Sequence, residues 1–89
     1  MFIRAASEYP DADHQIYKAS AKHKRLLLAY VIGLAEQAGA KDPGQLARQL
    51  MLLKEGAIVT AHMLGTEGVA ANSKIAARAL IEKALPHPA

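Results

Sequence analysis

The sequence predicts an all-α fold, a small antiparallel helical bundle formed by one domain over residues 1–85, and three observations support this prediction. The 89-residue chain is 52% apolar yet has one Phe, three Tyr and no Trp, so alanine and leucine supply most of its apolar content and favour closely packed helices. Apolar residues recur at helical intervals in long segments. Glycine, proline and aspartate punctuate these segments as they do at helix ends.

A short helix over residues 1–8 is predicted to precede a long helix over 12–38. Pro10 separates the two because it disfavours the helical conformation of the residue before it. Asp11 is suited to cap the long helix, and Gly39 is suited to end it in the left-handed conformation. The apolar stripe of the long helix comprises Ile16, Ala19, His23, Leu26, Leu27, Tyr30, Val31, Leu34, Ala35 and Ala38.

The next helix is predicted over 43–64, where Asp42 provides the N-cap and Pro43 occupies the first turn. Its apolar residues form two lines on roughly opposite sides. The first line consists of Leu46, Leu50, Leu53, Ala57, Ala61 and Leu64. The second line consists of Gln49, Leu52, Gly56, Val59, Thr60 and Met63. Both sides of this helix are therefore expected to be buried.

The last helix is predicted over 67–84 and is rich in small residues. Gly65 is expected to end the preceding helix, and Thr66 to act as N-cap of this one, with Glu67 in its first turn. Pro86 and Pro88 prevent the helix from continuing, so residues 86–89 are expected to form a disordered tail.

The second apolar line of helix 43–64 predicts a homodimer, because this chain has too few helices to cover both lines. Small residues on the last helix would let helices of two subunits approach closely in a four-helix interface. The interface residues expected there are Ala70, Ser73, Ala77, Leu80 and Ala84. Gly56 supports a close crossing, since a mid-helix glycine costs about 1 kcal/mol relative to alanine. The alternative is a monomer in which Gly56 is merely tolerated.

The charge distribution indicates a solvated surface rather than a dedicated anion-binding site. The net charge is +3, and the one basic cluster consists of Lys18, Lys22, His23, Lys24 and Arg25. An apolar run follows this cluster on the same predicted helix, as in an amphipathic surface helix. The longest apolar stretch is too short to span a membrane, and the lack of cysteine suits a reducing compartment, so we expect a cytoplasmic protein without a membrane partner.

No catalytic or metal-binding pattern is recognisable, so we expect neither an enzyme nor a bound cofactor. The four histidines, at positions 14, 23, 62 and 87, lack the spacing of a metal site. Ser20 and Ser73 have no evident base, and no glycine-rich phosphate loop is present. Glu55, within an apolar helix, is expected to be a structural ion-pair or capping partner, to Arg48 or Arg78.

Three segments of the chain resemble the regulatory part of TetR-family transcriptional regulators. The segment 41–61, with Asp42-Pro43, Leu46-Ala47, Gln49-Leu50 and Glu55-Gly56-Ala57, resembles the penultimate helix of that family. The segment 70–80 resembles its alanine-rich last helix, and the segment 2–11 resembles the end of an earlier helix and its connector. From the first segment to the last, the likeness extends over residues 2–80, almost the whole length of the chain.

The resemblance implies that the last two helices dimerise and that the earlier ones line part of a pocket for a small hydrophobic effector. The pocket residues it implies are Phe2, Ile3, Tyr17, Leu27 and Tyr30. The helix-turn-helix of the family has no counterpart in these residues, because Met1 already matches a region downstream of it. The expected function is thus ligand sensing and homodimerisation, without direct DNA contact. The alternative is a free-standing helical protein-interaction module without a small-molecule ligand.

Overall fold

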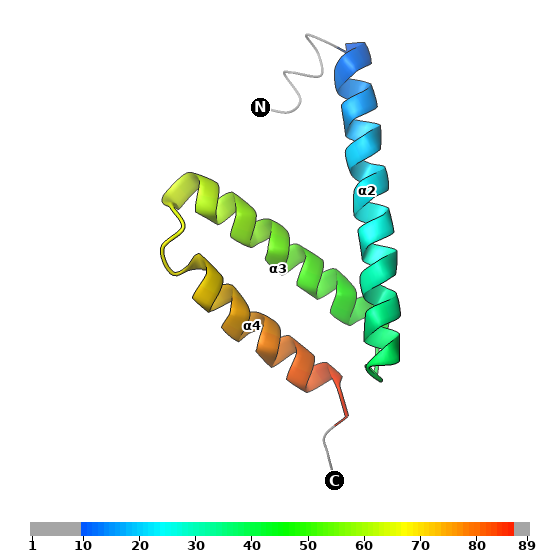
Figure 1. The fold of residues 1–89 in the computed structure, drawn as a ribbon, viewed down its shortest axis with the longest axis vertical. Coiled ribbons are helices and arrows are strands. Elements are labelled where there is room, and N and C mark those ends of the chain that lie inside the picture. The colour runs from blue at the N-terminus through cyan, green and yellow to red at the C-terminus, as the bar shows by residue number, and fades with distance from the viewer. Residues whose placement is uncertain (1–9, 87–89) are drawn as a thin grey trace.

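The computed structural model describes residues 10–86, with side chains from His14 onward, and every regular element in this part is a helix. The helices are α2 (Pro10–Gln37), α3 (Pro43–Leu64) and α4 (Val69–Ala84), joined by short loops (Figure 1). The all-α prediction is therefore confirmed for the described residues. The helix expected over residues 1–8 lies outside them, as do residues 87–89 of the expected tail.

Helix α2 begins at Pro10, two residues before its predicted start, since proline is well accommodated in the first turn of a helix. Gly39 ends it with φ +85°. The Gly39 N–H donates to the Glu36 carbonyl and the Ala40 N–H to the Ala35 carbonyl, both at 3.0 Å. This pair of bonds is a Schellman motif, which satisfies carbonyls at the helix end. The predicted glycine cap of α2 is confirmed.

Helix α3 begins as predicted, with Asp42 as its N-cap and Pro43 in its first turn. The Gln45 N–H donates to Oδ1 of Asp42 at 3.1 Å, which satisfies one of the amides left free at the start of a helix. Gly65, at φ +98°, follows the last residue of the helix, and its N–H donates to the Ala61 carbonyl. Both predicted ends of α3 are confirmed.

The aspartate cap leads to a prediction about stability. Asp42→Ala is expected to lower the free energy of unfolding by about 1 kcal/mol, because the Gln45 amide loses its acceptor. Asp42→Ser, which keeps a capping oxygen, is expected to retain most of that stability. Urea unfolding followed by circular dichroism measures both changes. Equal losses in the two variants would show that the capping bond contributes nothing.

The N-cap of α4 is Gly68, and the prediction that Thr66 would cap this helix is wrong. Residues 66–69 form a turn in which the Val69 N–H donates to the Thr66 carbonyl at 3.2 Å. Gly68 takes φ +75°, a left-handed conformation that glycine adopts without strain, and no side chain caps the helix. The helix therefore starts at Val69, two residues later than predicted.

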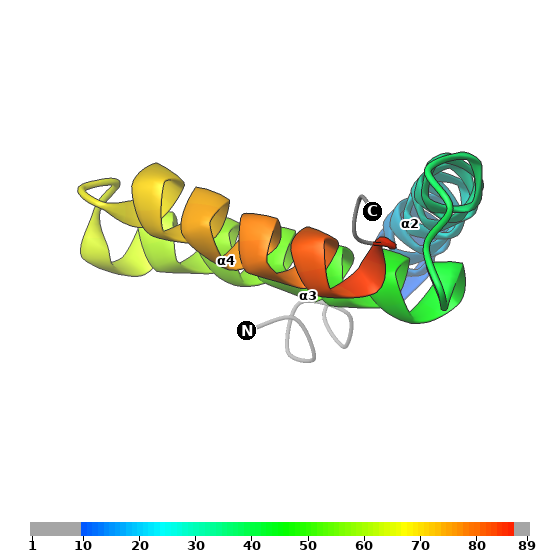
Figure 2. The same cartoon turned by 90° about the horizontal axis from the view of Figure 1, so that it is seen from below.

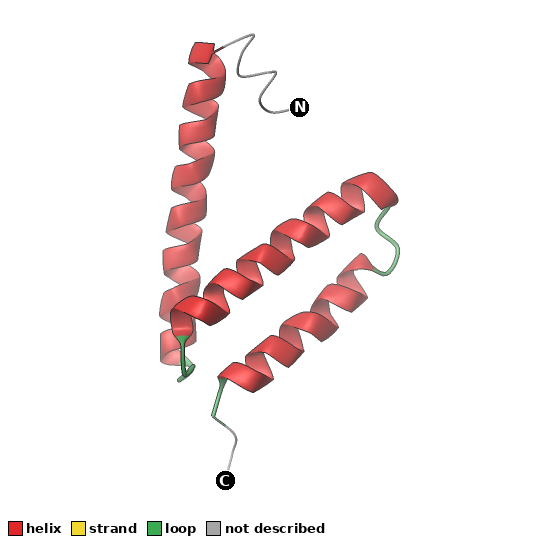
Figure 3. Ribbon diagram, turned by 180° about the vertical axis from the view of Figure 1, so that it is seen from behind, coloured by secondary structure: helices red, strands yellow, loops and turns green. Residues whose placement is uncertain are grey.

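The helices form an open arrangement in which α3 contacts both α2 and α4, while α2 does not contact α4. Helices α3 and α4 lie side by side and antiparallel, and α2 crosses the beginning of α3 and diverges from it (Figures 1 and 2). The view from behind shows the same arrangement of the three helices (Figure 3). The Lys41 N–H donates to the Ala84 carbonyl at 2.9 Å, which ties the end of α4 to the α2–α3 loop.

The intramolecular core is small. Ala35, Leu46 and Ala47 are the buried apolar residues of the described chain, and they lie where α2 crosses the start of α3. The Cα radius of gyration is 16.3 Å, whereas a compact domain of this length has a radius near 12 Å. The accessible surface of 7351 Å² exceeds by roughly 2,300 Å² the ~5,000 Å² expected of a compact monomer of this mass. Much apolar surface thus stays uncovered.

Candidate functional site

The second apolar line of α3 is exposed along its whole length. Gln49, Leu52, Gly56, Val59, Thr60 and Met63 are all exposed. Leu52 is 72% and Met63 76% accessible, and Val59 between them is 55% accessible. The first line, by contrast, packs within the molecule over most of its length, with Leu46 buried and Leu50, Leu53, Ala57 and Ala61 half-buried; Leu64 at its end is 84% accessible. The structure therefore separates the two lines as the sequence predicted, and only one of them is covered.

Gly56 lies in the middle of this exposed line. A Cβ atom placed on Gly56 would meet no atom within 4 Å, apart from those of its own helix backbone and its neighbours in the chain. Intramolecular packing therefore gives no reason for a glycine here. Because a mid-helix glycine costs about 1 kcal/mol relative to alanine, an external surface that approaches this point closely accounts for the residue better.

The residues of α4 assigned to the interface divide into two groups. Ala70 is exposed, beside the turn that joins α3 to α4. Ser73, Ala77, Leu80 and Ala84 are half-buried on the side of α4 that packs against α3. The sequence placed all five with the exposed line of α3, since small residues alone do not reveal which neighbour they meet. The larger exposed face is thus contributed by α3.

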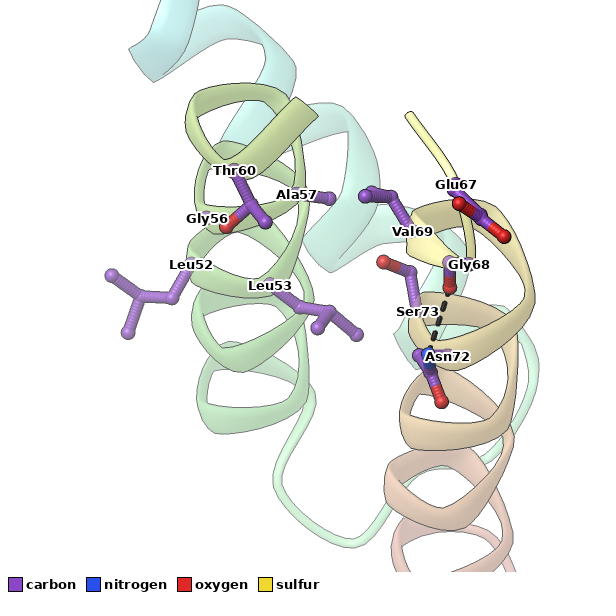
Figure 4. Close-up of a pocket in the computed structure, with 10 residues that line it drawn as sticks. All are labelled: Leu52, Leu53, Gly56, Ala57, Thr60, Glu67, Gly68, Val69, Asn72 and Ser73. Atoms are coloured by element: carbon purple, nitrogen blue, oxygen red, sulfur yellow. Dashed lines mark hydrogen bonds between the residues drawn. The ribbon is translucent and has the colours of Figure 1, made fainter. Parts of the chain in front are cut away.

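An open groove of about 470 Å³ separates the distal halves of α3 and α4. Figure 4 shows that Leu53 and Ala57 point toward α4 and that Val69 and Ser73 point back toward α3, whereas Leu52 points away from α4. Gly56 lines the groove on the side of α3, and Gly68 lines it at the start of α4. The Asn72 side-chain amide donates to the Gly68 carbonyl at 2.9 Å and holds that end in place.

The pocket residues implied by the resemblance are not brought together in the described part of the chain. Phe2 and Ile3 lie outside the described residues, and Tyr17 and Tyr30 are 73% and 65% accessible on α2. Leu27 is half-buried. None of these three described residues lines the α3–α4 groove or the hollow between α2 and α3. The N-terminal half of α2 diverges from α3, so within residues 10–86 its side chains have no neighbouring helix with which to enclose a ligand.

The hollow between α2 and α3, of about 350 Å³, combines an apolar floor with charged walls. Leu28, Met51 and Leu52 form the floor. Lys24, Arg25, Arg48 and Glu55 also line the hollow. Nζ of Lys24 lies 2.9 Å from Oε1 of Glu55. The expectation that Glu55 forms an ion pair is confirmed, but its partner is Lys24 and not Arg48 or Arg78, because the crossing of α2 brings Lys24 to this side of α3.

This ion pair is expected to contribute little to stability. Both side chains are well exposed, at 58% for Lys24 and 42% for Glu55, so water screens their attraction. A double-mutant cycle with Lys24→Gln and Glu55→Gln should give a coupling energy of about 0.2–1 kcal/mol, reduced further at about 1 M salt. A salt-independent coupling well above this range would contradict the exposed geometry.

Other classes of site find little support in the described residues. No group of three His, Asp or Glu side chains there is arranged to hold a metal ion. None of α2, α3 and α4 has the length and apolar character needed to cross a bilayer. The five members of the basic cluster, from Lys18 to Arg25, are all exposed, as predicted for a solvated face.

Comparison with known proteins does not assign the chain to a family: no protein-family model, curated protein or solved structure matches it.

Proposed function

We propose that this chain is the homodimerisation and ligand-sensing part of a TetR-type transcriptional regulator. The observation that carries the proposal is the exposed apolar face of α3, with Gly56 at its centre. In the proposed dimer, this face meets its counterpart around a twofold axis, and α3 and α4 of both subunits form a four-helix interface. A symmetric dimer uses the same patch on both subunits, which suits a single self-complementary face.

The surface area of the chain supports this assembly. An excess of roughly 2,300 Å² per subunit gives about 4,600 Å² for a pair. Interfaces of obligate homodimers bury about 2,000–5,000 Å² in total and are rich in apolar residues. A second copy of the chain could therefore remove from water the part of this excess that the α3 face contributes. A subunit with three buried apolar side chains among its described residues would gain much of its stability in this way.

The effector in this proposal is a small hydrophobic molecule, because most of the surface that lines the α3–α4 groove and the α2–α3 hollow is apolar. Leu52 lines both hollows and also lies on the proposed dimer face. A ligand in either hollow would thus contact a residue of the interface, which gives it a direct route to the dimer geometry. DNA binding belongs, in the proposal, to a helix-turn-helix outside these residues.

Sedimentation velocity over a hundredfold range of protein concentration tests the proposal. The expected result is a dimer at every concentration. A folded monomer throughout the range, shown by circular dichroism to keep its helices, would contradict it.

A further inference from the structure

A second apolar surface lies on α2, on the side away from α3. Leu26, Tyr30 and Leu34 are 61%, 65% and 46% accessible, and Ile16 nearer the N-terminus is 64% accessible. At 100° per residue, these four residues fall within one quadrant of the helix. The more buried residues of α2, among them Leu28, Val31 and Ala35, lie on its other side. We call Ile16, Leu26, Tyr30 and Leu34 the outer face of α2.

Positively charged side chains border part of this outer face. Lys18, Lys22 and Arg25 follow the spacing i, i+4, i+7, which places them in one line along the helix, and all three are exposed. No Asp or Glu occurs between His14 and Ala35. Lys24 projects toward α3, where it pairs with Glu55. Glu36 lies in the same line beyond the outer face. The border is therefore positive beside the N-terminal half of the outer face, and there it favours a partner with negative charge.

Gly33 lies between the apolar residues and this cationic border. A Cβ atom placed there would have no atom within 4 Å beyond its own helix backbone and chain neighbours, so the interior of the chain does not require glycine. A helix partner benefits from a missing side chain, because its backbone can approach closely at that point. A lipid surface gains nothing from it, since membrane docking depends on apolar area and charge.

We propose that the outer face of α2 binds an acidic amphipathic helix of a partner protein. The apolar stripe of the partner helix covers Leu26, Tyr30 and Leu34, and the partner backbone approaches α2 most closely at Gly33. Its carboxylates, at the spacing i, i+4, i+7, pair with Lys18, Lys22 and Arg25. The surface from Ile16 to Leu34 extends over about 27 Å, which calls for a partner helix of about five turns. This site is separate from the α3 face and does not require the proposed dimer.

A displayed library of five-turn helices tests the proposal against the full 89-residue chain. The library has a fixed leucine stripe, and each flanking position is free to be Glu, Lys or Gln. Selected helices are expected to carry Glu at positions spaced i, i+4, i+7. The variant K18E/K22E/R25E should bind these helices at least about tenfold more weakly. When the library is selected against this variant, the same flanking positions should carry Lys instead of Glu.

Two matched variants separate this site from general charge and from folding. K41E/K54E/K83E changes the net charge by the same amount at exposed positions elsewhere, and it should keep the affinity of the wild type within about threefold. Gly33→Leu should keep its helical circular dichroism, because its side chain meets open space. Gly33→Leu should nevertheless weaken the binding of the selected helices at least about tenfold, because the leucine side chain prevents their backbone from approaching α2 closely.

Several results would overturn the proposal. They are a library with no enriched sequence, selected helices that bind K18E/K22E/R25E as well as the wild type, and unchanged binding to Gly33→Leu. The last experiment measures binding of the chain to vesicles of phosphatidylglycerol and phosphatidylcholine. Binding to these vesicles through Lys18, Lys22 and Arg25, without any selected helix, would assign the outer face to a membrane surface instead. None of these results depends on whether the chain is a dimer in sedimentation.

Discussion

Gly56→Leu is expected to raise the dissociation constant of the proposed dimer by about 5- to 150-fold. Gly56 lies at the centre of the exposed α3 face, flanked by Leu52, Val59 and Met63. A leucine side chain there would separate two helices that approach each other at the glycine, and overpacking at such a crossing costs about 1–3 kcal/mol or more. The same side chain meets no atom within its own subunit. Sedimentation equilibrium measures the change in association directly.

Two further variants show whether a loss of association comes from the crossing. Gly56→Ala removes the helix-weakening glycine and should stabilise α3 by about 1 kcal/mol, while it weakens the dimer less than leucine does. Ala71→Leu adds the same leucine at an exposed position of α4 away from the expected interface, and it should leave the dissociation constant unchanged. If Gly56→Leu still formed a dimer as tight as the wild type, the interface would lie elsewhere.

The ends of the helices were the most predictable feature, because single residues determine them. Asp42 and Pro43 specify the start of α3 through a side-chain acceptor and a fixed φ. Gly39 and Gly65 take positive φ at the ends of α2 and α3. Thr66 misled the prediction because threonine and glycine can both start a helix. The left-handed turn at Gly68 depends on how the chain reverses between α3 and α4.

The partners of side chains between helices were less predictable, because they depend on the angle at which helices cross. The sequence placed Tyr30 and Val31 in a single stripe of α2, but they lie 100° apart around the helix, and α3 covers only one side of it, so Tyr30 is exposed and Val31 is half-buried. Glu55 pairs with Lys24 because the crossing of α2 brings Lys24 to this side of α3. The exposed line of α3 was predictable, because it follows from the helical period alone and lies about 100° around the helix from a line that packs mostly within the chain.

Leu46→Ala is expected to destabilise the chain more than any other single truncation to alanine within the described residues. Leu46 is 4% accessible and is the largest of the three buried apolar side chains. Truncation of a buried leucine to alanine costs about 2–5 kcal/mol, through lost transfer free energy and the cavity left behind. The total stability of a domain of this length is on the order of 5–10 kcal/mol. One substitution would therefore remove a large fraction of it.

The position of Leu46 makes this loss specific. Leu46 and Ala47 lie at the crossing of α2 and α3, together with Ala35, and the other apolar residues of the described chain are at least partly exposed. Leu64→Ala removes the same atoms from a side chain that is 84% accessible, and it should change the free energy of unfolding by less than about 0.5 kcal/mol. Urea unfolding at one fixed protein concentration compares the two variants, because association with a second copy would add to the apparent stability of both. Equal losses would mean that Leu46 is not the anchor of the crossing and that the stability of the subunit resides in the surfaces it shares with a partner.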